Sequence, residues 1–294
     1  MASSVIAVAG GSGSLGKTLV EELVLAGKHQ VVVLSRHGPK PGQDGVGKLK
    51  TVKINYDSIE SIQNILEANN IDTVISTLWI YDEATYQSQD RLIDAATQSS
   101  CTKRFIAGEF AAMMNEEYLR KSGLQWTRIA NGFVMDYYGR PHIKTNMPPS
   151  TWILDVENCS AVVPGTGEEV ITFTYTYDVA RAVVLLLDLC EWPEYSLIGG
   201  DDVTANQMIR VAEEARGRKF NVTYQSEKKV YEQWQATWTN GEPDVADLVI
   251  AVNLMAARGQ MQLPQEQEQR LNEKLPGFAP TRLERLIREA WTGR

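Results

Sequence analysis

Hydrophobic and polar positions alternate along the first half of the chain in a way that predicts strands and helices in turn. Apolar runs such as Val5–Ala9 and Gln30–Leu34 are typical of strands buried on both faces of a sheet. Between them, Leu15–Ala26 places apolar residues at the spacing of an amphipathic helix. Because this order repeats to about residue 130, the pattern predicts an α/β fold: a Rossmann-type, doubly wound parallel sheet covered on both faces.

The other elements expected in this half follow the same rule. They are strands at 49–54, 72–77, 103–107 and 124–130, and helices at 58–69, 84–98 and 113–121.

The pattern becomes irregular and aromatic from about residue 132, as in a loop that lines a pocket. Beyond it we expect two short strands around the turn at 164–169, and a buried helix at 178–189 for which Asp178 is the N-cap. Thr204 and Gln207 have the spacing of a capping box that opens another helix. We therefore expect two domains: an NADP(H)-binding domain at 1–150 and, at 151–294, a smaller, mostly helical substrate lobe interleaved with the sheet edge.

Composition and charge narrow the class of protein. The 294 residues are 43% hydrophobic and carry a net charge of -8 without a dense Lys/Arg run, which argues against a nucleic-acid partner. The cysteines are odd in number and lack metal-ligand spacing, so we expect neither a disulfide framework nor a metal site. The longest apolar run, at 182–187, is too short to span a bilayer. We expect a cytoplasmic protein, monomeric or homodimeric, without a membrane partner and with a small-molecule substrate.

Four glycines separate the first strand from the first helix. Gly10, Gly13 and Gly16 give one glycine-rich register, and Gly11, Gly13 and Gly16 give the dinucleotide-binding register G-x-G-x-x-G. In this context a glycine turns the chain sharply, another lets the backbone approach a pyrophosphate, and the last lets the helix pack on the strand. The free N–H groups of the helix would then bind phosphate, so we expect Ser14 and Leu15 to join the glycines in the cofactor site.

The end of the second strand indicates which dinucleotide binds. An NAD site would place an acid there for the ribose 2′-hydroxyl, but this chain has Ser35 and Arg36. A guanidinium and a hydroxyl suit a 2′-phosphate, so we predict NADP(H). The alternative is that Arg36 is only a surface charge.

Other candidates follow from the rule that ligands lie beyond the carboxyl ends of the strands. Cofactor residues expected on this ground are Ser76, Thr77, Leu78 and Asn131. Aromatic residues expected at the substrate are Trp79, Phe110, Phe133, Tyr138 and Trp152.

Several stretches carry a family resemblance. The segments AVAGGSGSLG, LSR, VISTL, KRFIAGEF and GLQWTRIANGFVMDYYG resemble the NmrA-like branch of atypical short-chain dehydrogenases, in particular the isoflavone-reductase-like enzymes. The resemblance implies a Rossmann domain, NADP(H) and reduction of phenolic or other aromatic metabolites, as in secondary metabolism. The same family includes redox-sensing regulators that bind the dinucleotide without turnover.

The chain departs from that family at the catalytic segment. The usual Ser-Glu-Phe-Gly motif is replaced by residues 108–111, and the place of the family's catalytic lysine falls near Ala112. A Tyr-x-x-x-Lys pair exists only at Tyr224 and Lys228, far along the chain, and we interpret it as chance. Tyr137 is therefore the candidate proton donor, because its place after Asn131 resembles the family's pocket edge.

Three functions remain open at this point. The first is an NADPH-dependent reductase of a small aromatic, quinone or enone-type metabolite. The second is a redox-sensing regulator, and the third is a non-redox isomerase or cyclase on the same fold. The aromatic segment 132–152 favours the first or third, and the absent lysine favours the second or third.

Overall fold

The computed structural model describes residues 4–39, 49–80, 82–108, 116–239, 245–265 and 270–294. The chain forms two compact units that are each discontinuous in sequence. Unit 1 comprises Met1–Ala130, Val179–Leu197 and Glu273–Phe278, and unit 2 comprises Asn131–Asp178, Ile198–Asn272 and Ala279–Arg294. The division into a cofactor domain at 1–150 and a substrate lobe at 151–294 stays a prediction.

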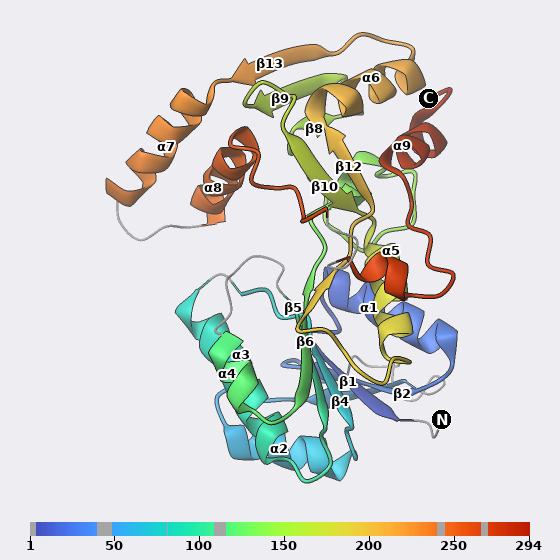
Figure 1. Cartoon of the computed structure of the whole chain (residues 1–294), viewed down its shortest axis with the longest axis vertical. Coiled ribbons are helices and arrows are strands. Elements are labelled where there is room, and N and C mark those ends of the chain that lie inside the picture. Colours follow the sequence, from blue (N-terminus) through green and yellow to red (C-terminus); the bar gives the residue numbers. More distant parts are fainter. Residues whose placement is uncertain (1–3, 40–48, 81, 109–115, 240–244, 266–269) are drawn as a thin grey trace. The chain divides into compact units, whose positions relative to one another are not determined.

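A seven-stranded sheet forms the centre of the described part of unit 1. Its strands are β1 Val5–Ala9, β2 Gln30–Ser35, β3 Leu49–Lys53, β4 Thr73–Ser76, β5 Arg104–Gly108, β6 Gln125–Ala130 and β11 Tyr195–Leu197. They lie in the order β11-β6-β5-β4-β1-β2-β3, and every neighbouring pair is parallel (Figure 1). The predicted doubly wound parallel sheet is thus confirmed, and its switch point lies between β1 and β4.

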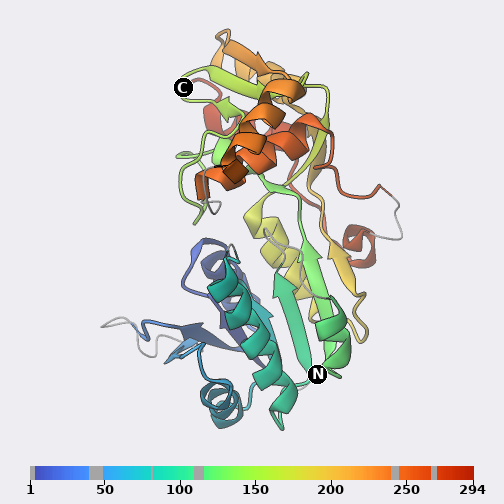
Figure 2. The same cartoon turned by 90° about the vertical axis from the view of Figure 1, so that its left-hand side faces the viewer.

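Helices cover both faces of this sheet. They are α1 Ser14–Ala26, α2 Ile59–Ala68, α3 Glu83–Gln98, α4 Glu116–Lys121 and α5 Thr176–Leu186. Figure 1 shows α1 and α5 on one face and α2, α3 and α4 on the other, and Figure 2 gives a second view of these layers. The adjacent side chains of Val31, Val32 and Val33 are all buried, which is the reason for the uninterrupted apolar run in β2.

Unit 2 contains more strands than the sequence pattern predicts. Its strands are β7 Phe133–Val134, β8 Leu154–Asp155, β9 Ser160–Pro164, β10 Val170–Thr174, β12 Asp201–Thr204 and β13 Asn221–Gln225. In the described residues they form two three-stranded sheets, β12-β10-β7 and β13-β9-β8. The pattern misses β12 and β13 because their side chains are mostly polar and partly exposed.

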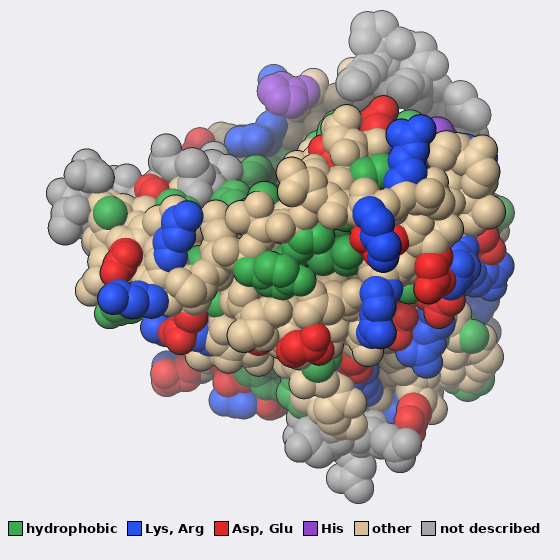
Figure 3. All heavy atoms as spheres, turned by 90° about the horizontal axis from the view of Figure 1, so that it is seen from above, with side chains coloured by type: hydrophobic (Ala, Val, Ile, Leu, Met, Phe, Trp, Pro, Cys, Tyr) green, Lys and Arg blue, Asp and Glu red, His purple; other side chains and the backbone are tan. Residues whose placement is uncertain are grey.

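Helices complete unit 2. They are α6 Ala205–Arg216, α7 Glu227–Thr239, α8 Val245–Ala257 and α9 Leu283–Trp291, with the 3-10 turns η1 Met135–Tyr138 and η2 Leu271–Lys274. The predicted capping box is confirmed, because Thr204 accepts the N–H of Gln207 while the Gln207 side chain accepts the N–H of Thr204. On the face in Figure 3, basic side chains lie beside acidic ones. None of the described helices has the length and apolar character needed to cross a membrane.

The start of α5 differs from the prediction. The helix begins at Thr176, so Asp178 lies inside its first turn and is not the N-cap. Its carboxylate accepts the N–H of Thr281 instead, at 2.6 Å. Asp136, which is fully buried, accepts hydrogen bonds from the backbone and the hydroxyl of Thr176, at 2.9 and 2.6 Å. The cap was missed because it comes from a residue 40 positions earlier in the chain.

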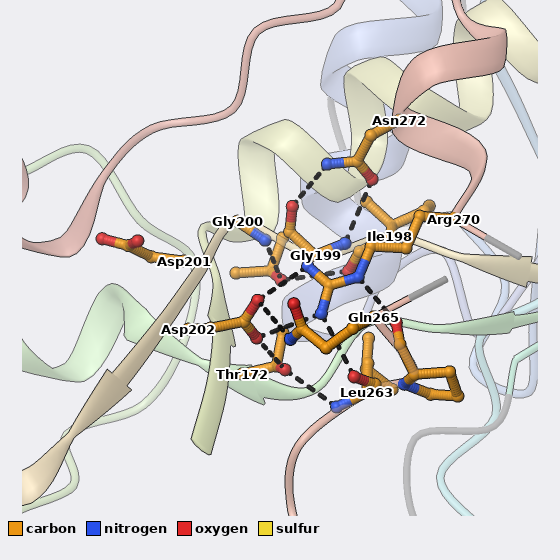
Figure 4. Close-up of polar contacts among 12 residues, drawn as sticks. Thr172, Ile198, Gly199, Gly200, Asp201, Asp202, Leu263, Gln265, Arg270 and Asn272 are labelled. Atoms are coloured by element: carbon orange, nitrogen blue, oxygen red, sulfur yellow. Dashed lines mark hydrogen bonds and ion pairs between the residues drawn. The ribbon is translucent and has the colours of Figure 1, made fainter. Parts of the chain in front are cut away.

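A polar network in unit 2 ties residues 263–265 and Arg270 to β10 and β12 (Figure 4). The Arg270 guanidinium forms two contacts with the Asp202 carboxylate, at 2.9 and 3.1 Å, and donates to the carbonyls of Leu263 and Pro264. Thr172 also donates to Asp202. Burial raises the pKa of Asp202, but hydrogen bonds from Arg270, Thr172 and Gln265 outweigh it and hold the pKa below the ordinary value.

Replacing Arg270 tests the strength of this network. We expect Arg270→Ala to lower the free energy of unfolding by about 3 kcal/mol, because it leaves a largely buried carboxylate without its cation. The stabilising effect of the lowered Asp202 pKa exists above its ordinary value of 3.8 and is lost as the pH falls through the folded-state pKa. The difference between wild type and variant should therefore shrink in acid.

Denaturant unfolding at several pH values measures both effects. Arg258→Ala is the control, since the Arg258–Glu227 pair is much more exposed and should contribute less than about 1 kcal/mol. Equal losses in the two variants would contradict the assignment.

Candidate functional site

The glycine-rich turn after β1 is closely packed. Gly10 has a φ of 76°, which disfavours a side chain, and its N–H donates to the Leu34 carbonyl at 3.3 Å. A Cβ on Gly16 would overlap the Gly10 carbonyl and lie 2.5 Å from the Thr77 hydroxyl. Gly11 is buried between strand and helix, whereas Gly13 is exposed and its N–H donates to the Gly10 carbonyl at 2.9 Å. Positions 10 and 16 therefore require glycine, the first because of its φ and the second because of the close approach of the helix to the turn.

The N-terminus of α1 presents free donors beside this turn. Gly13 is the N-cap and provides no capping side chain, and the first hydrogen bond of the helix runs from the Lys17 N–H to the Gly13 carbonyl. The N–H groups of Ser14, Leu15 and Gly16 precede that bond, and no described residue accepts from them. No acidic residue lies in the first turn. Such an end binds an anionic group, so these residues fit the pyrophosphate of a dinucleotide.

The end of β2 lies next to the same turn. Ser35 is buried and its hydroxyl accepts the N–H of His37 at 3.4 Å, so it holds the bend after the strand. Arg36 is exposed and has no ion-pair partner within the described residues. A guanidinium that is free of carboxylates is available for a phosphate.

The last residue of β4 and the residues just after it lie on the other side of the switch point. The Thr77 hydroxyl donates to the Ala9 carbonyl at 2.7 Å, and the Ser76 hydroxyl donates to the Gln89 side chain at 2.5 Å. Leu78 packs against the core, while Trp79 is 53% exposed. These contacts give the Ser76 and Thr77 hydroxyls structural partners, and the Thr77 hydroxyl also lies beside Gly16 at the start of α1.

Asn131 and Gly132 carry the chain from β6 into unit 2. Asn131 is buried, and its carbonyl accepts a hydrogen bond from the Thr174 hydroxyl at 2.6 Å. Gly132 has a φ of 64°, and a Cβ there would overlap the Thr172 carbonyl. The Asn-Gly-Phe sequence is thereby fixed to β10.

Three of the expected aromatic residues come together in unit 2. The ring centroids of Phe133 and Trp152 are 4.0 Å apart, and those of Phe133 and Tyr137 are 5.7 Å apart. The Trp152 indole donates to Asn253 at 2.7 Å, which fixes its orientation. All three rings are partly exposed. We call Phe133, Tyr137 and Trp152 the aromatic group.

Other expected residues lie elsewhere. Tyr138 is fully buried, and its hydroxyl donates to the Trp152 carbonyl at 3.1 Å, so it belongs to the core of unit 2. Trp79 is part of unit 1. Phe110, together with Ala112 and the rest of 109–115, lies outside the described residues.

Tyr137 is a protonated phenol. Burial raises its pKa, and the neighbouring Asp136 charge raises it further. The pair Tyr224 and Lys228 offers no substitute, because the Tyr224 hydroxyl donates to Asn206 and Lys228 lies near Glu232 at 4.0 Å. Tyr137 can therefore donate a proton but is not held as a phenolate.

Comparisons with known proteins agree with this geometry. A family described as NAD(P)H-binding matches residues 10–111. Oxidoreductase BOA1 of Botryotinia fuckeliana is 30% identical over 231 residues, which cover 73% of this chain and 77% of that protein. Oxidoreductase swnN of Metarhizium robertsii is 29% identical over 262 residues, 76% of each protein. The chain belongs to the NAD(P)H-binding, NmrA-like family of atypical short-chain dehydrogenases. It is therefore an oxidoreductase that binds NAD(P)H, as its sequence predicts.

A solved structure shows the same fold over the whole chain of this NmrA-like oxidoreductase. The complex of leucoanthocyanidin reductase with NADPH, from Vitis vinifera, has a TM-score of 0.74 at 16% identity and covers 97% of this chain and 99% of that one. At this identity the likeness concerns the fold alone.

Sequence reasoning missed two features of unit 2 in this oxidoreductase. Burial raises the pKa of Asp136, and hydrogen bonds from Thr145 and Thr176 only partly offset it. The Lys144 ammonium lies 4.2 Å from the centroid of the Tyr177 ring, whose hydroxyl accepts from Asn146 at 3.3 Å. No short sequence motif predicts either feature. The one indication of Asp136 in the sequence is that an acidic residue lies within an apolar stretch.

Enlarging Gly16 tests the turn. We expect Gly16→Ala to weaken NADPH binding about tenfold or more and to lower the melting temperature, because the methyl group pushes α1 away from the Gly10 carbonyl. Fluorescence titration with NADPH measures the affinity. Lys17→Ala, which changes the exposed neighbour, should bind as wild type does, and an unchanged affinity in Gly16→Ala would contradict the packing argument.

Proposed function

We propose that this oxidoreductase is an NADPH-dependent reductase of a small aromatic, quinone or enone-type metabolite of secondary metabolism. The observation that carries the proposal is the aromatic group, in which Tyr137 offers a neutral phenol beside two partly exposed rings. Aromatic side chains in this arrangement bind planar ligands by stacking. The reductase reading is also supported by relatives named as oxidoreductases.

The cofactor preference rests on the corner at the end of β2. Arg36 is exposed and unpaired within the described chain, and the sequence at this position has no acid for a ribose 2′-hydroxyl. When bound, reduced nicotinamide supplies a hydride to the substrate. The glycine turn and the N–H groups of α1 would hold the pyrophosphate, and Arg36 the 2′-phosphate.

The chain must also supply a proton. Reduction of a quinone or enone adds a hydride to one atom and leaves negative charge on oxygen, which a donor then protonates. Tyr137 would donate this proton through its phenolic hydroxyl, and solvent would restore it. An electron-poor acceptor suits a chain whose phenol has a raised pKa, because the acceptor needs little activation by a strong acid.

Arg36 tests the choice of dinucleotide. Arg36→Ala should weaken NADPH binding about thirtyfold, because it removes a charge-assisted contact to phosphate, and should leave NADH binding nearly unchanged. Fluorescence titrations with both nucleotides measure the two affinities, and His37→Ala is the control for the adjacent exposed residue. If both affinities fall together, or neither changes, Arg36 does not read the 2′-phosphate.

Turnover tests the reaction. Purified protein should consume NADPH with one or more members of a panel of quinones and enones, followed at the absorbance band of reduced nicotinamide. Tyr137→Phe should lower kcat about a hundredfold for an enone, because the proton donor is lost. Tyr224→Phe is the matched control and should keep wild-type kcat.

If the protein binds NADPH but oxidises it with no member of the panel, the proposed reductase function is wrong. This outcome would leave a dinucleotide-binding regulator or a non-redox isomerase or cyclase as the function.

A further inference from the structure

Tyr56 places a phenol at the corner formed by the ends of β2 and β3. It follows β3 by three residues, just after the Ile54 N–H extends the pairing to the Ser35 carbonyl at 3.1 Å. The ring belongs to the same buried cluster as Ala9 and Leu34, and the residue is only 6% exposed. The ring is therefore fixed by core packing at the carboxyl edge of the sheet.

The Tyr56 hydroxyl has no acceptor for its proton among the described residues. Its oxygen is buried and has no partner at full hydrogen-bond geometry. The Gly10 N–H and the Arg36 guanidinium lie close enough to lower its pKa, but both groups are donors. The phenolic proton thus has no acceptor, although buried polar atoms in proteins are nearly always paired. An acceptor supplied by a ligand would complete this arrangement.

The protonation state suits an anionic acceptor. Burial raises the pKa of Tyr56, and the Gly10 N–H and Arg36 only partly offset it. The hydroxyl consequently stays neutral at physiological pH and can donate to a phosphate oxygen without repelling it.

We propose that Tyr56 is a second determinant of selectivity for NADP(H), with its phenolic O–H donating a hydrogen bond to the 2′-phosphate that Arg36 also binds. The inference rests on the proposed preference for NADPH and adds a residue to it. The core-packed ring positions the donor, and the exposed guanidinium provides the charge. A phosphate oxygen placed between them would satisfy a buried hydroxyl and an unpaired cation together.

Nucleotide fragments test the role of Tyr56 without requiring turnover. Adenosine 2′,5′-bisphosphate carries the 2′-phosphate, and 5′-AMP lacks it, so calorimetric titration with each isolates that group. Tyr56→Phe should bind the bisphosphate about tenfold more weakly and 5′-AMP as wild type does. Tyr118→Phe is the matched control, because the Tyr118 hydroxyl interacts with Asp94 on α3, and it should change neither affinity.

Double substitution sharpens the result. If both residues hold one phosphate, the effect of Tyr56→Phe should be smaller in an Arg36→Ala background than in wild type. Thermal unfolding of each variant checks that the fold is kept.

The outcomes separate this inference from the proposal beneath it. A wild-type protein that binds the two fragments equally would overturn both the NADPH preference and the role of Tyr56. A wild-type preference that persists in Tyr56→Phe overturns the Tyr56 role alone. Equal weakening of both fragments in Tyr56→Phe also overturns it, since the phenol would then only support the glycine turn.

Discussion

The contact between the first helix and the first strand is the constraint on which the cofactor region depends. Gly16 lies against the Gly10 carbonyl and the Thr77 hydroxyl, so the start of α1 reaches the carboxyl edges of β1 and β4 directly. A side chain at this point would move the helix dipole and its free N–H groups away from the crevice. The parallel sheet determines where the crevice lies, and the contact of Gly16 determines that the N–H groups of α1 face this crevice.

Two carboxylates of unit 2 differ in how well their partners offset the cost of burial. Asp136 accepts three hydrogen bonds yet keeps a raised pKa, because burial exceeds what its donors return. Asp202, by contrast, has a guanidinium and a lowered pKa. Asp136 therefore holds the start of α5, and its charge adds to the burial that raises the pKa of Tyr137. Asp202 instead secures the fold through its ion pair with Arg270.

Local patterns predicted the sheet well because its strands are buried on both faces and its helices have caps nearby. Ser58 and Asp82, for example, cap α2 and α3 from the adjacent residue. Prediction failed where the partner is distant in sequence: the α5 cap comes from Asp136, and the partly exposed strand β13 pairs with β9 across about sixty residues. Tyr138 shows the same limit, since an aromatic segment does not reveal which ring turns inward.

The cofactor residues were easier to propose than the chemical ones for a related reason. The glycines at 10–16 lie between a strand and a helix, where their spacing is typical of a dinucleotide-binding turn, so the sequence itself is informative. Tyr137 and Tyr56 depend on burial and on neighbours that no short motif encodes. The roles proposed for them rest on the burial and the neighbours of their phenolic oxygen atoms.

Gly199 is a glycine for reasons of space, because its φ does not lie in the left-handed region. The Asn272 amide contacts its backbone on both sides, at 3.1 and 2.5 Å, and a Cβ there would lie 2.7 Å from the Arg270 guanidinium. A larger residue at 199 would therefore have to move the guanidinium away from its contacts with Asp202.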